Sequence, residues 1–313
     1  MMKKALRFFF ALLAVAMMPG LLSCEKAVLD EEEKQQGTES SKESSTKDTT
    51  EGANLVLRVS GFSVVPFETR AQVPIADYCT RLNFVVYRDS KKVKAITQKQ
   101  GDVNYGQVGM DLEKGLYQVL VVAHSSKGNP SLANPEKIQF TNDDGFSDTF
   151  YFYGEVTVTD EQLVQDVVLE RVTSMLRFQT EDPVPAEVQQ IRLYFTGGSG
   201  ALDATTGYGC VNSQQMVYFD ITEDMVGRPV CLETYTILKA ETATLKLVVT
   251  AYGTNPNDGS VKILGEKEFA SVPMERNKIT QYSGWFFSER PQASHSFRVV
   301  AETDWGGVTE LEY

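Results

Sequence analysis

The stretch Leu82-Asn83-Phe84-Val85-Val86-Tyr87 shows the pattern that decides the fold of this chain. Successive side chains of an extended strand point to opposite faces of a sheet, so apolar residues at every second position predict a β-strand with one face in a core. Residues 55–59 repeat the pattern, with Arg58 on the polar side. Hydrophobic residues make up 42% of the sequence and aromatic residues 10%, which favours a protein built mainly of strands.

Runs of this kind recur about every dozen residues, as they do in β-sandwich proteins. They are separated by turn-forming segments such as Glu113-Lys114-Gly115 and Gly227-Arg228-Pro229. Few stretches repeat apolar residues at helical spacing, and the best of them is a short helix candidate near residues 159–166. The expected strands are 55–59, 82–87, 93–97, 116–123, 137–140, 149–153 and 164–169, followed by 174–179, 188–196, 215–221, 231–238, 244–252, 261–269, 278–287 and 296–301.

The two series of strands predict an all-β protein with two β-sandwich domains, at residues 53–170 and 171–313. Roughly 260 residues remain after the N-terminal segments described below, a length that suits two ordinary domains. Because no polar linker stands near Glu170, we expect the two domains to be in close contact.

The N-terminus has the features of an export signal. Lys3, Lys4 and Arg7 make its start positive, and residues 8–18 form an apolar run too short for a permanent membrane span. The run closes at Leu21-Leu22-Ser23-Cys24, which resembles the bacterial lipoprotein signal. We therefore predict a signal peptide at residues 1–23 and a lipid on Cys24, where more than one acyl chain holds the protein in the membrane. The alternative is an ordinary secreted precursor with an incidental cysteine.

Residues 24–52 contain more acids than lysines, many Ser and Thr, and no aromatic residue. Such a segment cannot bury enough apolar area to offset its ordering entropy, so we predict a disordered tether between membrane and folded part. An acidic run just after the cysteine also resembles the signal that sends Bacteroidetes lipoproteins to the outer face of the outer membrane. The alternative is a solvated linker that carries no sorting signal.

The charge of the chain excludes one class of partner. The formal net charge is −12, and residues 1–23 contain three of the 30 basic residues and no acid, so the remainder carries −15. Binding of nucleic acid needs clustered Lys and Arg, so we exclude it.

Cysteines beyond Cys24 are Cys79, Cys210 and Cys231, an odd number without the paired spacing of a zinc site. Cys210 and Cys231 are a candidate disulfide in an exported protein, and separate buried thiols are the alternative.

Candidate catalytic and metal residues are few. Gly197-Gly198-Ser199-Gly200-Ala201 comes close to the nucleophile elbow of serine hydrolases, with His295 as a candidate base, but Ala201 replaces the last glycine and no helix follows. We therefore interpret the segment as a turn between sheets. His124 and His295 are the only histidines, so a histidine-rich metal centre is excluded.

Two acidic segments, 142–145 and 255–259, resemble fragments of calcium loops. Each lacks an acidic or amide residue at the first ligand position and the closing Glu, so we interpret both as turns. We expect no cofactor, no metal and no enzymatic activity.

Three stretches are distinctive: Leu112-Glu113-Lys114-Gly115-Leu116-Tyr117-Gln118-Val119 with residues 121–125, Tyr194-Phe195-Thr196-Gly197-Gly198-Ser199-Gly200-Ala201, and above all Val272-Pro273-Met274-Glu275-Arg276-Asn277-Lys278-Ile279-Thr280 running into Gly284-Trp285-Phe286-Phe287. They resemble Bacteroidales fimbrial subunits, the group of FimB/Mfa2-like and fimbrillin lipoproteins. The resemblance covers the whole chain, and it implies two tandem transthyretin-like Greek-key sandwiches. It also implies assembly by addition of a strand from one subunit to the next, which pairs an open sheet edge.

The resemblance leaves two subunit types open. Stalk members are cut by a trypsin-like protease after an early arginine, whereas anchor members keep the lipid. Arg70, followed by Ala71, is a candidate cut site, and an ordinary loop arginine is the alternative. We expect an anchor or accessory subunit in the outer membrane that supports adhesion. Its expected partners are other fimbrial subunits and a host or bacterial surface receptor.

A second functional hypothesis is a surface lipoprotein that binds glycans. It requires exposed aromatic side chains that form a flat platform. The candidates are Trp285, Trp305, Tyr151 and Tyr153, although alternation along the strands predicts that some of them point inward.

Overall fold

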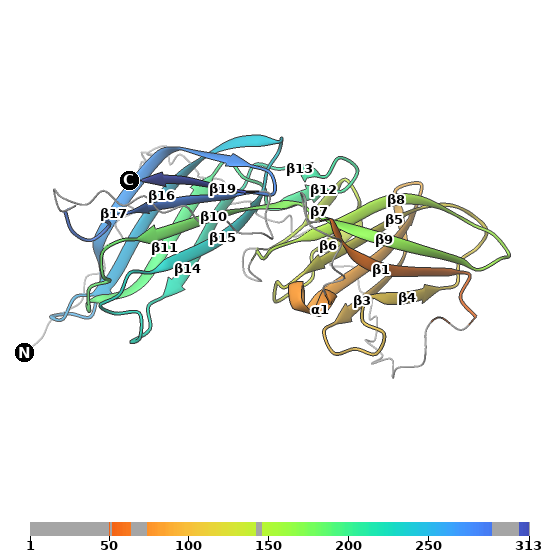
Figure 1. The fold of residues 1–313 in the computed structure, drawn as a ribbon, viewed down its shortest axis with the longest axis horizontal. Coiled ribbons are helices and arrows are strands. Elements are labelled where there is room, and N and C mark those ends of the chain that lie inside the picture. The colour runs from red at the N-terminus through yellow and green to blue at the C-terminus, as the bar shows by residue number, and fades with distance from the viewer. Residues whose placement is uncertain (1–49, 51, 64–73, 142–145, 290–306, 313) are drawn as a thin grey trace, which may run out of the picture. The chain divides into compact units, whose positions relative to one another are not determined.

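The computed structural model describes residues 50, 52–63, 74–141, 146–289 and 307–312 (Figure 1). Most of these residues lie in strands, and the only helix in the described ranges, α1 (Ile75–Tyr78), is a single turn. The prediction of an all-β fold is confirmed. No helix in this part of the chain is long and apolar enough to cross a membrane.

The described strands of the first half build one large sheet and part of a small one. They are β1 (Leu55–Ser63), β2 (Arg81–Arg88), β3 (Lys91–Lys99), β4 (Gln107–Met110), β5 (Gly115–His124), β6 (Ser131–Asn134), β7 (Lys137–Gln139), β8 (Phe150–Val158) and β9 (Leu163–Arg171). The large sheet has the order β3-β2-β5-β8-β9-β1-β4. Asp89 and Ser90 join β2 to β3 with φ of 53° and 60°, as a two-residue hairpin turn requires. Alternate side chains of this sheet, among them Phe84 and Val121, form the first core.

Strand β1 is an internal member of this sheet. It pairs in parallel with β9 and antiparallel with β4. Leu55 and Leu57 are fully buried in the first core, while Arg58 faces solvent and donates from Nη2 to Asp166 Oδ2 at 2.9 Å. The chain just before the candidate cut site is therefore a core strand.

The second half contains two four-stranded sheets around a core of its own. Its described strands are β10 (Thr173–Thr180), β11 (Val188–Thr196), β12 (Ala201–Asp203), β13 (Tyr208–Gly209), β14 (Gln214–Asp220), β15 (Cys231–Ile237), β16 (Thr242–Thr254), β17 (Val261–Glu275), β18 (Ile279–Gly284) and β19 (Val308–Glu312). One sheet has the order β15-β10-β18-β19 and the other β14-β11-β16-β17. Phe178, Leu193 and Leu247 are fully or almost fully buried in this second core. Strand β18 runs parallel to both of its neighbours, β10 and β19.

A third small sheet joins the two halves, in the order β13-β12-β7-β6. Its central pair is β7 of the first half with β12 of the second, with Leu202 opposite Ile138. Both side chains are fully buried in an apolar cluster that draws on both halves. Strand β9 ends at Arg171 and β10 begins at Thr173 in a different sheet, while the assignment of 53–170 and 171–313 as separate domains stays a prediction.

Some local predictions were wrong. The helix expected near residues 159–166 is absent, because β9 begins at Leu163 and pairs there with Leu55 of β1. Pairing between distant strands here overrides the local helical spacing. The short strands β4, β6, β12, β13 and β19 were not expected, and β17 extends past residue 269 to Glu275. The strand expected at 296–301 lies outside the described residues.

Candidate functional site

Three predicted site residues, Cys24, Arg70 and Ala71, lie outside the described residues. The described residues nearest to Arg70 are Ser63, at the end of β1, and Pro74, just before α1. The lipid on Cys24 and the cut after Arg70 therefore stay predictions.

The structure contradicts the candidate disulfide between Cys210 and Cys231. Cys231 begins β15, whereas Gly209, next to Cys210, donates its N–H to the carbonyl of Leu238, just past the other end of that strand. At about 3.3 Å per residue the two cysteines lie roughly 20 Å apart, while a disulfide needs Cα atoms within about 7 Å. Cys210 is an exposed thiol and Cys79 a buried one. Burial raises the pKa of Cys79 to about 11, so that thiol stays protonated and unreactive.

Ser199, considered above as a nucleophile, is fully buried and holds a turn together. Its hydroxyl donates to the carbonyl of Ala201 at 2.7 Å and accepts from the amide of Val211 at 3.3 Å. The segment carries the chain from the sheet of β11 to the sheet of β12, as the turn interpretation predicted. His295 lies outside the described residues.

Within the described ranges, no group of three or more His, Cys, Asp or Glu could hold a metal ion. The acidic segment at 255–259 closes the hairpin of β16 and β17, which confirms its interpretation as a turn. Asp258 accepts hydrogen bonds from the amide and the hydroxyl of Ser260, and Gly259 has φ of 71°. The other acidic segment, 142–145, lies outside the described residues.

The predicted aromatic platform is not formed by the tyrosines proposed for it. Tyr151 and Tyr153 are half-buried and pack against the apolar cluster shared by the two halves. Trp285 is also half-buried, with its indole nitrogen shielded from solvent. Trp305 lies outside the described residues. Tyr151 and Tyr153 therefore do not form a flat exposed platform, and the candidate Trp305 stays a prediction.

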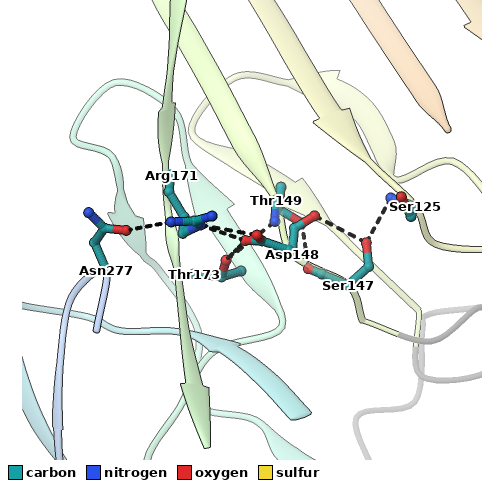
Figure 2. Close-up of polar contacts among 7 residues, drawn as sticks. All are labelled: Ser125, Ser147, Asp148, Thr149, Arg171, Thr173 and Asn277. Carbon is teal, nitrogen blue, oxygen red and sulfur yellow. Dashed lines mark hydrogen bonds and ion pairs between the residues drawn. The ribbon is translucent and has the colours of Figure 1, made fainter. Parts of the chain in front are cut away.

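An ion pair between a buried arginine and an aspartate whose side chain is 20% exposed lies where the chain passes from the first half to the second (Figure 2). The Arg171 side chain is only 3% exposed, and its Nε lies 3.0 Å from Asp148 Oδ1. Thr173 donates its hydroxyl to the same carboxylate oxygen at 2.7 Å, and the Arg171 guanidinium also lies 4.7 Å from the ring centre of Phe150. Burial raises the pKa of the Asp148 carboxyl, and its contacts with Arg171 and Thr173 act against that shift.

The segment Val272 to Thr280, which carried the most specific part of the resemblance, contributes to the same junction. It contains the turn from β17 to β18, where Asn277 has φ of 57°, a conformation that Asn adopts more readily than most residues. The Asn277 side chain accepts a hydrogen bond from Arg171 Nη1 at 3.2 Å (Figure 2). The guanidinium of Arg276 lies 4.8 Å from the ring centre of Tyr208. This segment therefore holds the turn after β17 against the end of β9.

The segment after β18 is held by one buried carboxylate. Asp182 is fully buried and accepts backbone hydrogen bonds from Phe286, Phe287 and Ser288 at 2.7–2.8 Å. The Ser288 hydroxyl donates a fourth bond at 3.0 Å. Phe286 packs against Phe178 in the second core, with ring centres 5.6 Å apart. Asp182 thereby ties residues 286–288 to the body of the second half.

Sequence reasoning missed Asp148, Arg171 and Asp182. One signal was available for Arg171, because it continues the inward-facing series of Val167 and Leu169 in β9 and so stands at a core position. A charged residue is rarely buried unless it is paired. Asp148 and Asp182 show no comparable local pattern, since their partners come from distant segments.

His124 makes the stability of the first half sensitive to acid. Its ring is fully buried, with Nε2 2.9 Å from Asn83 Oδ1, and Nδ1 has no hydrogen-bond partner among the described residues. Burial, with a smaller contribution from Arg81, lowers the pKa of His124 to about 4. The unfolded chain takes up this proton near pH 6.5.

Between pH 6.5 and 4 the unfolded state therefore binds the additional proton, and the free energy of unfolding is expected to fall as the pH falls. Keeping His124 neutral contributes roughly 3 kcal/mol to the free energy of unfolding. This contribution is fully present above pH 6.5 and is lost by about pH 4. Denaturant unfolding of the wild type and of His124→Gln, measured from pH 7.5 to 4, checks this. The wild-type curve should fall more steeply in that window, and parallel curves would contradict the assignment.

The sequence matches the model of a protein family, fimbrillin-A associated anchor proteins Mfa1 and Mfa2, over residues 71–264. The match covers well over half of the chain and stops before the segment at 272–280. A comparison with curated proteins finds no match.

Solved structures with a similar arrangement of strands include three from Bacteroides and Porphyromonas species. A candidate adhesin from Bacteroides ovatus has a TM-score of 0.46 and 14% sequence identity, covering 72% of this chain and 86% of its own. A candidate polysaccharide-binding protein from Bacteroides thetaiotaomicron has a TM-score of 0.41 and 11% identity, and the match covers 67% of this chain and 78% of that protein. The fimbrial anchor protein Mfa2 from Porphyromonas gingivalis has a TM-score of 0.39 and 12% identity, and the match covers 71% of this chain and 98% of that protein.

With TM-scores below 0.5, these structural similarities carry no argument about function, and the assignment rests on the family match. The chain therefore belongs to the family of fimbrillin-A associated anchor proteins Mfa1 and Mfa2, and it is a cell-surface fimbrial component alongside other fimbrial subunits.

Proposed function

We propose that this chain is an anchor or accessory subunit held in the outer membrane by a lipid on Cys24, without enzymatic activity. The tether at 24–52 links that lipid to the folded part. Other fimbrial subunits are its partners, and a host or bacterial surface receptor is a further one. The family match supports the fimbrial part of this proposal, and the place of β1 supports the anchoring part.

The observation that carries the anchoring role is that β1 is an internal strand, paired on both sides. Its neighbours are β9 on one side and β4 on the other, and Leu55 and Leu57 are fully buried. A pull on the tether reaches the folded part at the N-terminal end of β1, a strand that is hydrogen-bonded to neighbours on both sides. The tether is thereby attached to the folded part through a strand that is costly to remove.

Strand addition is proposed at the last described strand, β19. It is the edge of the sheet β15-β10-β18-β19 and has one described neighbour, β18. Its five residues are exposed or half-buried, so exchanging it costs less burial than exchanging β1. By contrast, the nine-residue edge strand β3 contains Lys91, Lys92, Lys94 and Lys99, and lysines on an edge discourage pairing with another chain.

The experiment compares protein from outer membranes with protein from sheared surface fibres, by intact mass and N-terminal sequencing. The expected result is an acylated Cys24 at the N-terminus, recovered with the membrane and with fibre attached, and the same result for Arg70→Ala. A wild-type chain that starts at Ala71 in sheared polymer would instead show a processed stalk or tip subunit. Acylated monomer without any associated fibre would contradict the fimbrial role.

A second arm of the experiment locks β19 in place. Ser283 and Glu312 are register partners on β18 and β19, and parallel neighbours lie about 4.8 Å apart, within reach of a disulfide. We expect oxidised Ser283→Cys/Glu312→Cys protein to retain less fibre on the cells, and reduction to restore retention. Glu312→Cys alone is the control. Normal fibre retention by the oxidised double variant would exclude β19 as the exchanged strand.

A further inference from the structure

The outer face of the sheet β14-β11-β16-β17 carries a groove that the fimbrial role does not use. Its volume is about 430 Å³, and residues from all four strands line it. The lining residues are Gln189, Gln190, Tyr218, Asp220, Tyr252, Gly253, Thr254 and Val261.

An irregularity in β11 supplies the polar part of the groove. The pairing of β11 with β16 shifts register between Val188 and Gln190, so that Gln189 has no register partner in that ladder. A bulge of this kind re-aims side chains, and both glutamines here line the groove. Gln190 Nε2 donates to Asp220 Oδ1 at 2.7 Å, and the Thr254 hydroxyl donates to Gln189 Oε1 at 2.6 Å. The Gln190 amide and the Asp220 carboxylate therefore hold each other in place, and Thr254 holds the Gln189 amide.

Two tyrosines supply the aromatic part. Tyr218 on β14 is 52% exposed, and Tyr252 on β16 is half-buried. The guanidinium of Arg192 lies 5.5 Å from the ring centre of Tyr252 and donates to the hydroxyl of Thr250 at 2.9 Å, which fixes the position of that ring. Tyr218 and Tyr252 stand on opposite sides of β11, which separates their backbones by about 10 Å or more.

This combination matches the chemistry of a sugar. A pyranose ring has an apolar face of C–H groups, which packs against an aromatic ring, and an edge of hydroxyls, which both donate and accept hydrogen bonds. Asp220 retains a second carboxylate oxygen as an acceptor, and each glutamine retains donor or acceptor capacity beyond the bonds described. An apolar protein segment in this groove would leave these polar groups buried without partners, which is costly.

We propose that this groove binds a neutral glycan, with Tyr218 and Tyr252 packing against two of its sugar residues and Asp220, Gln189 and Gln190 binding hydroxyls. The glycan is neutral because a carboxylate lines the groove and the chain outside residues 1–23 carries a net charge of −15. This inference is independent of the anchoring role, since the groove lies on neither β1 nor β19.

The test uses the full chain, solubilised in a detergent without a sugar headgroup, and calorimetric titration with defined probes. The neutral probes are maltohexaose, cellohexaose, mannohexaose and galactohexaose, and the acidic probe is hexagalacturonate. We expect at least one neutral probe to bind, and Tyr218→Ala to weaken that binding at least tenfold. Asp220→Asn should also weaken it. Met216→Ala is the matched control, because Met216 is on the same strand and face as Tyr218, is 42% exposed and does not line the groove.

Unchanged unfolding midpoints of the variants show that they remain folded, as expected for exposed side chains. Binding of none of the neutral probes would overturn the proposal, as would equal affinities of wild type and Tyr218→Ala, or a preference for the acidic probe. Sedimentation velocity adds one more decisive outcome. Self-association that is lost in Tyr218→Ala would make this face an interface between copies of the chain and overturn the glycan assignment.

Discussion

Asp182→Ala is expected to lower the free energy of unfolding by about 4 kcal/mol, the larger of two strong effects predicted from single carboxylates. The substitution removes the acceptor of three backbone N–H groups, those of Phe286, Phe287 and Ser288. Each buried donor left without a partner costs about 1–3 kcal/mol. The loss also releases Phe286 from its contact with Phe178 in the second core. For a chain of this size the expected fall in Tm is roughly 10 °C.

Thermal and denaturant unfolding, followed by tryptophan fluorescence, measure this effect because Trp285 precedes the three amides. Asp258→Ala is the matched control, since that carboxylate also accepts hydrogen bonds but lies in an exposed turn. We expect the control to unfold like the wild type. Asp182→Asn should be intermediate, because an amide keeps one acceptor oxygen and brings a donor close to N–H groups. Equal midpoints for Asp182→Ala and the control would show that water replaces the carboxylate.

Asp148→Ala is expected to destabilise the chain by about 3–4 kcal/mol, because it leaves the buried Arg171 guanidinium without its counter-ion. The Arg171 side chain is 3% exposed, and two of its other contacts, with Asn277 Oδ1 and with the ring of Phe150, involve groups without a full charge. Thr173 loses its acceptor as well. The effect should therefore resemble that of breaking a buried ion pair.

Asp166→Ala provides the comparison, because the pair of Arg58 and Asp166 has similar geometry but side chains that are 51% exposed. Exposed pairs contribute little to stability, so we expect almost no change in that variant. In an Arg171→Met background, Asp148→Ala should lower the free energy of unfolding much less, because the guanidinium that would lose its counter-ion is no longer present. An Asp148→Ala variant as stable as Asp166→Ala would show that solvent reaches the junction.

The junction also bears on how the subunit transmits force. Arg171 at the end of β9 contacts Asn277 in the turn between β17 and β18, and β7 pairs with β12. If β1 holds the tether, a load passes through β9 and then through this junction to the second half. A weakened junction is thus expected to uncouple the halves before either core opens.

Much of the strand pattern was predictable from sequence, because it depends on neighbouring residues. Alternation at residues 82–87 and 188–196 identified β2 and β11, and the glycine-rich segment before Ala201 was correctly interpreted as a turn. The helix near residues 159–166 was wrong, because the partner that decides its conformation, β1, lies about a hundred residues away. The strands that were missed are mostly short, and they exist only through their pairing with other strands.

For the candidate sites, too, the local sequence indicates some residues, while the tertiary structure alone shows which of them lie together. Tyr218 and Asp220 alternate on one face of β14, a local signal, but nothing in the sequence places Gln190 and Tyr252 beside them. The aromatic residues chosen from sequence for a platform, Tyr151 and Tyr153, are packed against a core, because the sequence does not tell which face of a strand the fold covers.

The sequence by itself determined the fold class and the resemblance to a fimbrial family, because composition, period and short motifs are properties of the chain. The lipid on Cys24 and the exclusion of nucleic-acid binding stay predictions. Only the tertiary structure decided that β1 is an internal strand, that Cys210 and Cys231 are apart, that a buried Arg171 pairs with Asp148, and that a buried Asp182 binds three backbone N–H groups. The physical reason is that these features depend on contacts between distant segments. Arg171 and Asn277 are 106 residues apart, as are Asp182 and Ser288, and only folding brings such partners together.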